Sequence, residues 1–157
     1  MGAANERGAY CLPEVNDEVL VGFEHGDIHR PYIIGGVWNG RDATPRAVDD
    51  TIQSGKVRLR TIKTRTGHFI EFVEEDKGGS KAGVYVETAS GHKLHINDSD
   101  KFVQIETSGG HQIKMDDRGL PTISVSSTGN LSLQAQGEIE IKAGGTVTVN
   151  GTFIRLN

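Results

Sequence analysis

Three histidines are the residues whose type and spacing could carry chemistry in this sequence. His68, His92 and His111 each follow a glycine, and each stands two residues before a pair of apolar residues separated by one polar residue. Imidazoles repeated at one position could bind a metal ion or an anion if symmetry brought three copies together. No carboxylate or second histidine shares their face at ligand spacing. We therefore expect packed, hydrogen-bonded histidines, with no bound metal and no cofactor.

Two charged stretches suggest other chemistry. Glu74, Glu75 and Asp76 could be read as an acid pair for glycan hydrolysis, but adjacent loop carboxylates lack a fixed separation. The basic residues between positions 56 and 65 have only two phenylalanines nearby for stacking, so a solvated outer face is expected instead of a nucleic-acid site. The sequence also lacks a phosphate-binding loop, a nucleophile elbow and a Cys/His cluster. It predicts no enzyme.

Composition narrows the functional class further. The 157 residues carry a formal charge of -4, which argues against nucleic acid as the main partner, and 21 glycines against 4 prolines suggest many tight turns. The single cysteine, Cys11, cannot form an intrachain disulfide. Neither a signal peptide nor an apolar run of about 18 residues is recognisable. We expect synthesis as a soluble cytoplasmic protein that another machine would have to export.

The chain divides at a stretch without apolar periodicity. Residues 12–40 predict two strands and a hairpin, with Val19, Val21 and Phe23 on one face and a turn over residues 24–30. Residues 41–55 lack that pattern and predict a linker. The expected organisation is therefore a segment over 1–40, a linker over 41–55 and a repetitive region over 56–157.

The repetitive region consists of apolar pairs that recur at shortening intervals. The spacing falls to about eight residues, and glycine replaces histidine before the later pairs, so we expect the object to taper. The pairs are Val57/Leu59, Ile70/Phe72, Val84/Val86, Leu94/Ile96, Val103/Ile105, Ile113/Met115, Ile123/Val125, Leu131/Leu133, Ile139/Ile141, Val147/Val149 and Ile154/Leu156.

A unit of eight residues is one short strand and a turn, which cannot enclose a core alone. Closed layers could come from one coiled chain or from three chains. We expect three chains, with each protomer contributing every third strand, so that every octad adds a layer. The predicted fold is all-β: an intertwined homotrimeric triple-stranded β-helix or β-prism, with the outward Lys56, Arg58 and Arg60 on a solvated wall.

Residues 12–39, LPEVNDEVLVGFEHGDIHRPYIIGGVWN, resemble the OB-fold signature of the VgrG and phage-baseplate spike family. The family pattern is LP-x-x-G-D-E-V-L-V-x-F-x-x-G-D-x-x-R-P-x-x-x-G. Asn16 stands where the pattern has glycine, and this change should be tolerated if the turn is left-handed, because asparagine is the next-best residue there. The Gly-His units at Gly67, Gly91 and Gly110 also resemble the family's triple-stranded β-helix.

The resemblance implies a homotrimeric spike that helps to pierce an envelope at the tip of a phage tail, type VI secretion system or extracellular contractile particle. It implies a PAAR-repeat tip protein at the C-terminal end, against Ile154, Leu156 and Asn157, and transient contact with a target membrane. Hub, baseplate and tube proteins would bind through upstream domains that this sequence lacks. We therefore expect an N-terminally shortened fragment with a partial OB fold.

Two other functions stay open from the residues alone. A single-chain β-solenoid enzyme acting on polysaccharide would need converging acidic and basic side chains along one groove, and no such set is recognisable. An OB-type binder of oligonucleotides or glycans would use residues 12–40, but aromatic residues are few and the charge balance is acidic.

Overall fold

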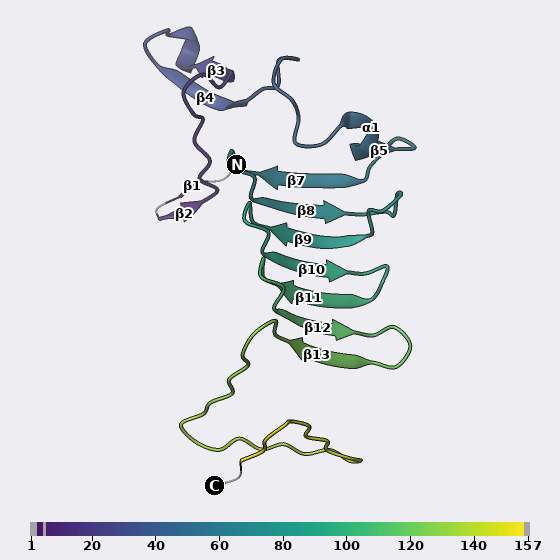
Figure 1. The fold of residues 1–157 in the computed structure, drawn as a ribbon. Coiled ribbons are helices and arrows are strands. Elements are labelled where there is room, and N and C mark those ends of the chain that lie inside the picture. Colours follow the sequence, from purple (N-terminus) through teal and green to yellow (C-terminus); the bar gives the residue numbers. More distant parts are fainter. Residues whose placement is uncertain (1–2, 5, 156–157) are drawn as a thin grey trace.

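The computed structural model describes residues 3–4 and 6–155 and is built almost entirely of β-strands. The short strands β1 (Ala3–Ala4) and β2 (Arg7–Gly8) pair with each other, and a longer hairpin of β3 (Val19–Phe23) and β4 (Pro31–Gly36) follows. Figure 1 shows this hairpin beyond one end of a seven-stranded sheet, with an extended C-terminal segment beyond the other end. The all-β class predicted from the sequence is confirmed.

The β3–β4 hairpin contains the two strands expected within residues 12–40. The chain reverses through η1 (Glu24–Gly26), where the backbone N–H of Glu24 donates to the carbonyl of Arg30 at 3.1 Å. An irregularity between Leu20 and Val21 shifts the register of the pairing. Asn16 has a φ of 81°, a left-handed conformation in which asparagine can replace glycine.

The segment predicted as a linker contains secondary structure of its own. Helix α1 (Val48–Thr51) leads into β5 (Ile52–Gln53), which pairs with β6 (Lys56–Val57). Two acidic residues, Asp49 and Asp50, occupy the helix, where carboxylates near the N-terminal end are favourable. This short helix positions the Asp50 carboxylate close to the start of the large sheet.

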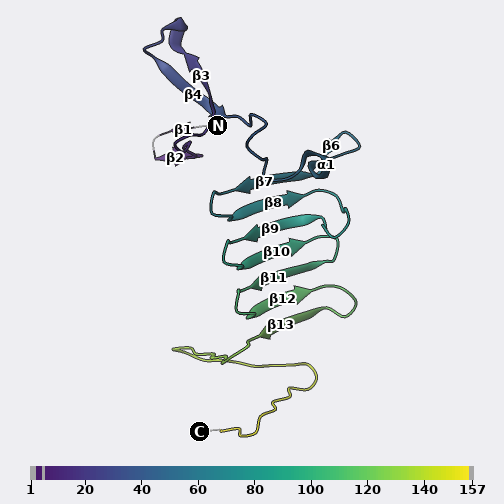
Figure 2. The ribbon, with the colours of Figure 1, turned by 45° about the horizontal axis from the view of Figure 1, so that its top comes forward.

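Residues 59–126 form one antiparallel sheet in which each strand pairs with its neighbours in the sequence, as Figures 1 and 2 show. Alternate turns are tight and use Gly67, Gly91 and Gly110, whose φ values are 100°, 87° and 84°. Glycine adopts this backbone without strain, which explains the recurring Gly-His units. The strands are β7 (Leu59–Lys63), β8 (Phe69–Val73), β9 (Gly83–Glu87), β10 (Lys93–Asn97), β11 (Phe102–Glu106), β12 (Gln112–Asp116) and β13 (Thr122–Ser126).

This pairing corrects one sequence-based prediction. Successive units over residues 59–126 were expected to pair with other chains, yet in the structure they hydrogen-bond to each other. Period-two patterning defines the faces of a strand but not its partners, and turns this short favour hairpins. The prediction that the first apolar pair shares the face of the later pairs was also wrong, because Leu59 lies opposite Val73 on the other face.

The octad segment, residues 127–155, follows β13 as extended chain. Bends recur at residues 128–129, 136–137, 144–145 and 152, once every eight residues, and no strand pairing is assigned to this part of the described chain. Its apolar residues are exposed, among them Leu133 and Ile141. The octad period is therefore present in the backbone, without partners for its hydrogen bonds in the single chain.

Very little apolar surface is buried. Among the described residues, Leu59 and Val73 are the only apolar side chains that are buried. No helix in this described part has the length and apolarity that crossing a bilayer requires. A single chain thus leaves most of its apolar side chains in contact with solvent.

Candidate assembly surface

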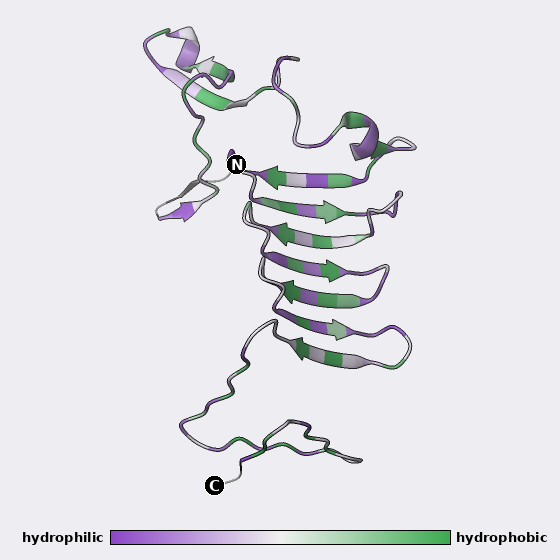
Figure 3. Ribbon diagram, viewed as in Figure 1, coloured by the Kyte–Doolittle hydropathy of each residue, from purple (hydrophilic) through white to green (hydrophobic). Residues whose placement is uncertain are grey.

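One face of the seven-stranded sheet carries two continuous columns of apolar side chains, which we call the apolar face. The strand register aligns Ile70 with Val86 and Phe72 with Val84, and the same alignment continues across the sheet. Figure 3 shows the resulting alternation of apolar and polar residues along the strands. The first column is Ile62, Ile70, Val86, Leu94, Ile105, Ile113 and Val125, and the second is Phe72, Val84, Ile96, Val103, Met115 and Ile123.

The apolar face is open to solvent in the single chain. Ile105, near the middle of the sheet, is 50% exposed, and Ile123 on β13 is 74% exposed. A contiguous apolar surface of this kind is unusual on a soluble monomer and typical of an interface. The apolar face is therefore uncovered in the single chain, and another polypeptide segment could pack against it.

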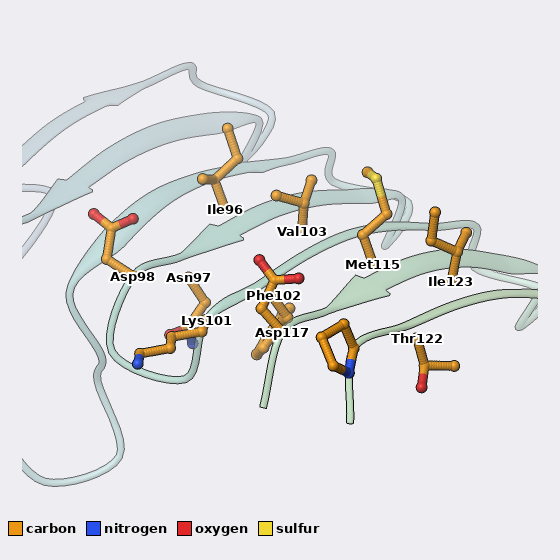
Figure 4. A pocket seen from close by; sticks show the side chains of 11 residues that line it. Ile96, Asn97, Asp98, Lys101, Phe102, Val103, Met115, Asp117, Thr122 and Ile123 are labelled. Atoms are coloured by element: carbon orange, nitrogen blue, oxygen red, sulfur yellow. The ribbon is translucent and has the colours of Figure 1, made fainter. Parts of the chain in front are cut away.

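Figure 4 shows a hollow of about 600 Å³ at one edge of this face. The side chains of Ile96, Val103, Met115 and Ile123 stand in a row on one side of their strands, and loop residues including Pro121 complete the lining. The hollow belongs to the second apolar column. In the single chain, the side chains that line it are not covered by other apolar side chains.

The three histidines lie in a further column on the side of the apolar face. Backbone hydrogen bonds join Thr88 to His92 and Thr107 to His111. Going from strand to strand along this column, threonines therefore alternate with the histidines. His68 Nδ1 accepts the backbone N–H of Ala89 at 3.2 Å, and the other two histidines accept N–H groups from Ser108 and Thr128, each at 3.3 Å. His68 and His92 thus each bind the next tight turn, and His111 binds the bend after β13.

These hydrogen bonds favour packed histidines over ligands. An Nδ1 atom that accepts an N–H group has its lone pair occupied, so the neutral ring carries its proton on Nε2 and offers only a donor there. Groups of three potential metal-binding residues are also absent from the described residues. His68, His92 and His111 are separate positions along the sheet, and all three are exposed in the single chain.

The residue that sequence reasoning missed most clearly is Arg58. It was expected on a solvated outer wall, yet its side chain is 1% exposed. Its guanidinium donates to the Asp50 carboxylate at 2.9 Å, to the Asp50 carbonyl at 3.0 Å and to the Glu75 carbonyl at 3.1 Å. Arg58 therefore joins α1 to the sheet. Its proximity to α1 could not be read from strand periodicity.

Arg46 makes a second connection between the segment before the sheet and the sheet itself. Its guanidinium forms two hydrogen bonds with the buried carboxylate of Glu71, at 2.5 and 2.9 Å. The hydrogen bond to Glu71 raises the pKa of Arg46 above its ordinary value. Thr61 also donates to Glu71, at 2.8 Å, which leaves that carboxylate well satisfied.

The predicted tip-binding residues are only partly covered by the structure. Ile154 is 54% exposed at the end of the octad segment. Leu156 and Asn157 lie outside the described residues. The structure brings none of the three histidines near this end.

Comparison with known proteins finds similarity to components of injection machines. Residues 1–38 match the family described as the type VI secretion system/phage-baseplate injector OB domain. The type VI secretion system spike proteins VgrG1a of Pseudomonas aeruginosa and VgrG3 of Vibrio cholerae are 31% and 32% identical to the chain over half of its length. The match to the latter runs over 79 residues.

The chain is thus similar to members of the VgrG and phage-baseplate spike family. A longer but weaker similarity extends this relationship, because the actin cross-linking toxin VgrG1 of Vibrio cholerae is 25% identical over 142 residues, or 90% of this chain. The chain covers only 12% of that relative and 8% to 12% of the two VgrG spike proteins. The comparison therefore concerns a small part of each VgrG protein.

Proposed function

We propose that this chain is a mechanical part of a contractile injection spike, in which three copies associate through their apolar faces. The observation that carries the proposal is that most side chains of the two apolar columns, such as Ile105 and Ile123, are exposed in one chain. Burial of apolar surface contributes roughly 25 cal/mol per Å², so covering these two columns would stabilise an assembly strongly. The family relationship supports a spike built from copies of one chain.

The two halves of the repetitive region would contribute differently to a trimer. Over residues 59–126 each chain supplies a complete sheet, so three sheets would form the sides of a prism with the apolar faces inward. The octad segment bends without reversing, and it would find strand partners in the other two copies. In the proposed trimer this segment forms the intertwined β-helix. We also propose that the chain is divided into a partial OB segment over residues 1–40, a linker over 41–55 and a spike region over 56–157.

The proposed spike works without catalysis and without a cofactor. Its proposed partners are hub, baseplate and tube proteins on the OB side, a PAAR-repeat protein near Ile154, and transiently a target membrane. Its proposed place is a contractile particle that acts outside the producing cell. One relative carries the name of a toxin, but that name belongs to a protein of which this chain covers 12%.

Light scattering on adjacent variants of β13 tests the proposal. Ile123 and Ser124 are both exposed in the single chain but lie on opposite faces of the strand. Wild type should have three times the 16.9 kDa chain mass. Ile123→Glu places charges inside the prism and should lower the mass, whereas Ser124→Glu should leave it unchanged. A monomeric wild type, or equal effects of the two variants, would refute the trimer.

A further inference from the structure

The face of the sheet opposite the apolar face has a hollow of about 350 Å³. We call it the outer hollow. It extends over β8 to β11, and Arg46 and the loop before β9 contribute to its walls. Pockets that bind small molecules commonly start near about 300 Å³. Assembly through the apolar face would leave this opposite side open to solvent.

The outer hollow has an ordered floor. Glu71 is only 5% exposed and is held by Arg46 and Thr61, while the guanidinium of Arg46 lies 5.6 Å from the centroid of the Phe69 ring. Val73 and Asn97 are also buried there. Side chains locked in this way form a preformed surface, which lowers the ordering cost of binding.

Aromatic side chains supply apolar planes in the outer hollow. Phe69, Tyr85 and Phe102 line it from three different strands, and the ring of Tyr85 meets that of His95 edge-on with centroids 4.9 Å apart. Burial raises the pKa of Tyr85, so its phenol stays neutral, and the hydroxyl donates to the Lys81 carbonyl at 2.8 Å. The Tyr85 ring is therefore held in place, and the Phe102 ring contacts Lys114 and Arg118, whose charged groups lie 4.7 and 5.7 Å from its centroid.

The polar groups of the outer hollow include both donors and acceptors. His95 Nε2 and Glu87 Oε1 are 2.7 Å apart, and the Asp100 carboxylate accepts only a long contact of 3.4 Å from Asn97. The Glu87 Oε2 atom has no recorded partner among the described residues. Carboxylate oxygens with spare acceptor capacity therefore face a hollow whose floor is aromatic.

The balance of charge selects a ligand class. Arg46 and Lys81 oppose the carboxylates of Glu71, Glu87 and Asp100, and His95 contacts Glu87, so the charges of the lining are close to balanced. Such a site disfavours anions and gives a cation little net attraction. Hydroxyl groups, which donate and accept, fit these partners, and the C–H faces of a sugar ring fit the aromatic planes.

We propose that the outer hollow binds a neutral saccharide of one or two rings, with its hydroxyl groups on Glu87 and Asp100 and its C–H face on Phe102 and Tyr85. This is separate from the assembly of the spike, because the residues lie on the opposite face of the sheet. A peptide ligand would need unpaired backbone partners along a strand edge. The central strands β8 to β11 have both edges paired.

Saturation-transfer difference NMR on the full chain tests the inference with three neutral probes, N,N′-diacetylchitobiose, cellobiose and maltose. We expect transfer to at least one probe. Asp100→Ala should weaken its binding about tenfold, or 1.4 kcal/mol. The matched control is Asp117→Ala, a turn carboxylate that does not line the outer hollow. Phe102→Leu, which keeps an apolar side chain but removes the ring plane, should also weaken binding.

Three results would overturn the inference. They are absence of transfer to all three probes, equal binding by wild type and both lining variants, and stronger binding of glucosamine or glucuronate than of the neutral probes. Light scattering and circular dichroism on each variant establish that it is folded and assembled. A trimer that binds none of the probes refutes only the saccharide site, whereas a monomer that binds one refutes only the proposed spike.

Discussion

At the scale of single residues, the charged side chains around the first strands of the sheet are more organised than their sequence positions suggest. Arg46 and Arg58 both lie in or beside the predicted linker, and each reaches a carboxylate in another part of the chain. A charge that is buried requires hydrogen-bonding partners, because an unpaired one is costly. Arg58 has those partners in α1 and in the loop after β8.

Replacing Arg58 with methionine should destabilise the fold by about 2–4 kcal/mol, since it removes four donors and leaves the Glu75 carbonyl unsatisfied. Arg60→Met is the matched control, because Arg60 is 56% exposed and its pair with Glu74 is a surface ion pair. Chemical unfolding of both variants measures the difference. Equal destabilisation would contradict the buried role of Arg58.

Asp76 should make the fold sensitive to acid. A hydrogen bond from Ser99, helped by Ala82 and Lys81, lowers the pKa of Asp76 to about 2. An ordinary unfolded aspartate titrates near about 4, so the stabilisation is present above that pH and is lost as the pH falls from about 4 toward 2. In Asp76→Asn this part of the pH dependence should disappear. Thermal melts across this range measure it, with Asp98→Asn as the control, which should keep the wild-type profile.

At the scale of elements, the periodic pattern predicted the strands but not their pairing. The residues of Ile70/Phe72 and the later pairs through Ile123/Val125 share a face as expected, because alternation along a strand depends only on backbone geometry. The choice between a hairpin and a partner chain depends on turn geometry. The tight turns at Gly67, Gly91 and Gly110 were visible in the sequence as Gly-His units, and they indicate hairpins.

The same limit applies to the candidate sites. The apolar face could be predicted because its members recur as pairs separated by one residue, which places both on one face of a strand. The outer hollow could not, because Phe69, Tyr85 and Phe102 come together only through the register of four strands and through loops that bring Arg46 and Asp100 beside them. The interpretation of the three histidines as packed residues followed from the lack of companions on their face. In the single chain they are hydrogen-bonded at Nδ1 but exposed, so their packing stays a prediction for the assembly.

Gly83 is the element-scale position that should tolerate substitution least. Its φ is 151°, and an added Cβ would lie 2.1 Å from the carbonyl oxygen of Ile96 on β10. Gly83→Ala should therefore separate the ends of β9 and β10 and cost more than about 2 kcal/mol. Gly79→Ala, in the preceding loop, has open space around its Cβ and should be nearly neutral. Thermal unfolding compares them, and a stable Gly83→Ala would argue against the register of β9 and β10.

At the scale of the whole molecule, the sheet and the octad segment should respond differently to dilution. The sheet has its own backbone hydrogen bonds, whereas residues 127–155 have no strand pairing in the single chain. Hydrogen exchange should find amides of Leu133 and Val149 protected in the assembled protein and unprotected after dissociation by Ile123→Glu. Amides of β10 should stay protected in both. Protection of the octad segment in a monomer would show that it folds without neighbours.

The sequential pairing of β7 to β13 has a consequence for how the protein forms. Each hairpin closes a short loop, so the contact order within the sheet is low. The strands can therefore pair one after another on a single nascent chain. Meeting of three such sheets is then a concentration-dependent step, and the octads can interlock only after it. Until the three sheets meet, newly made chains expose apolar surface. Rapid overproduction should therefore favour aggregation more than slow synthesis at low abundance does.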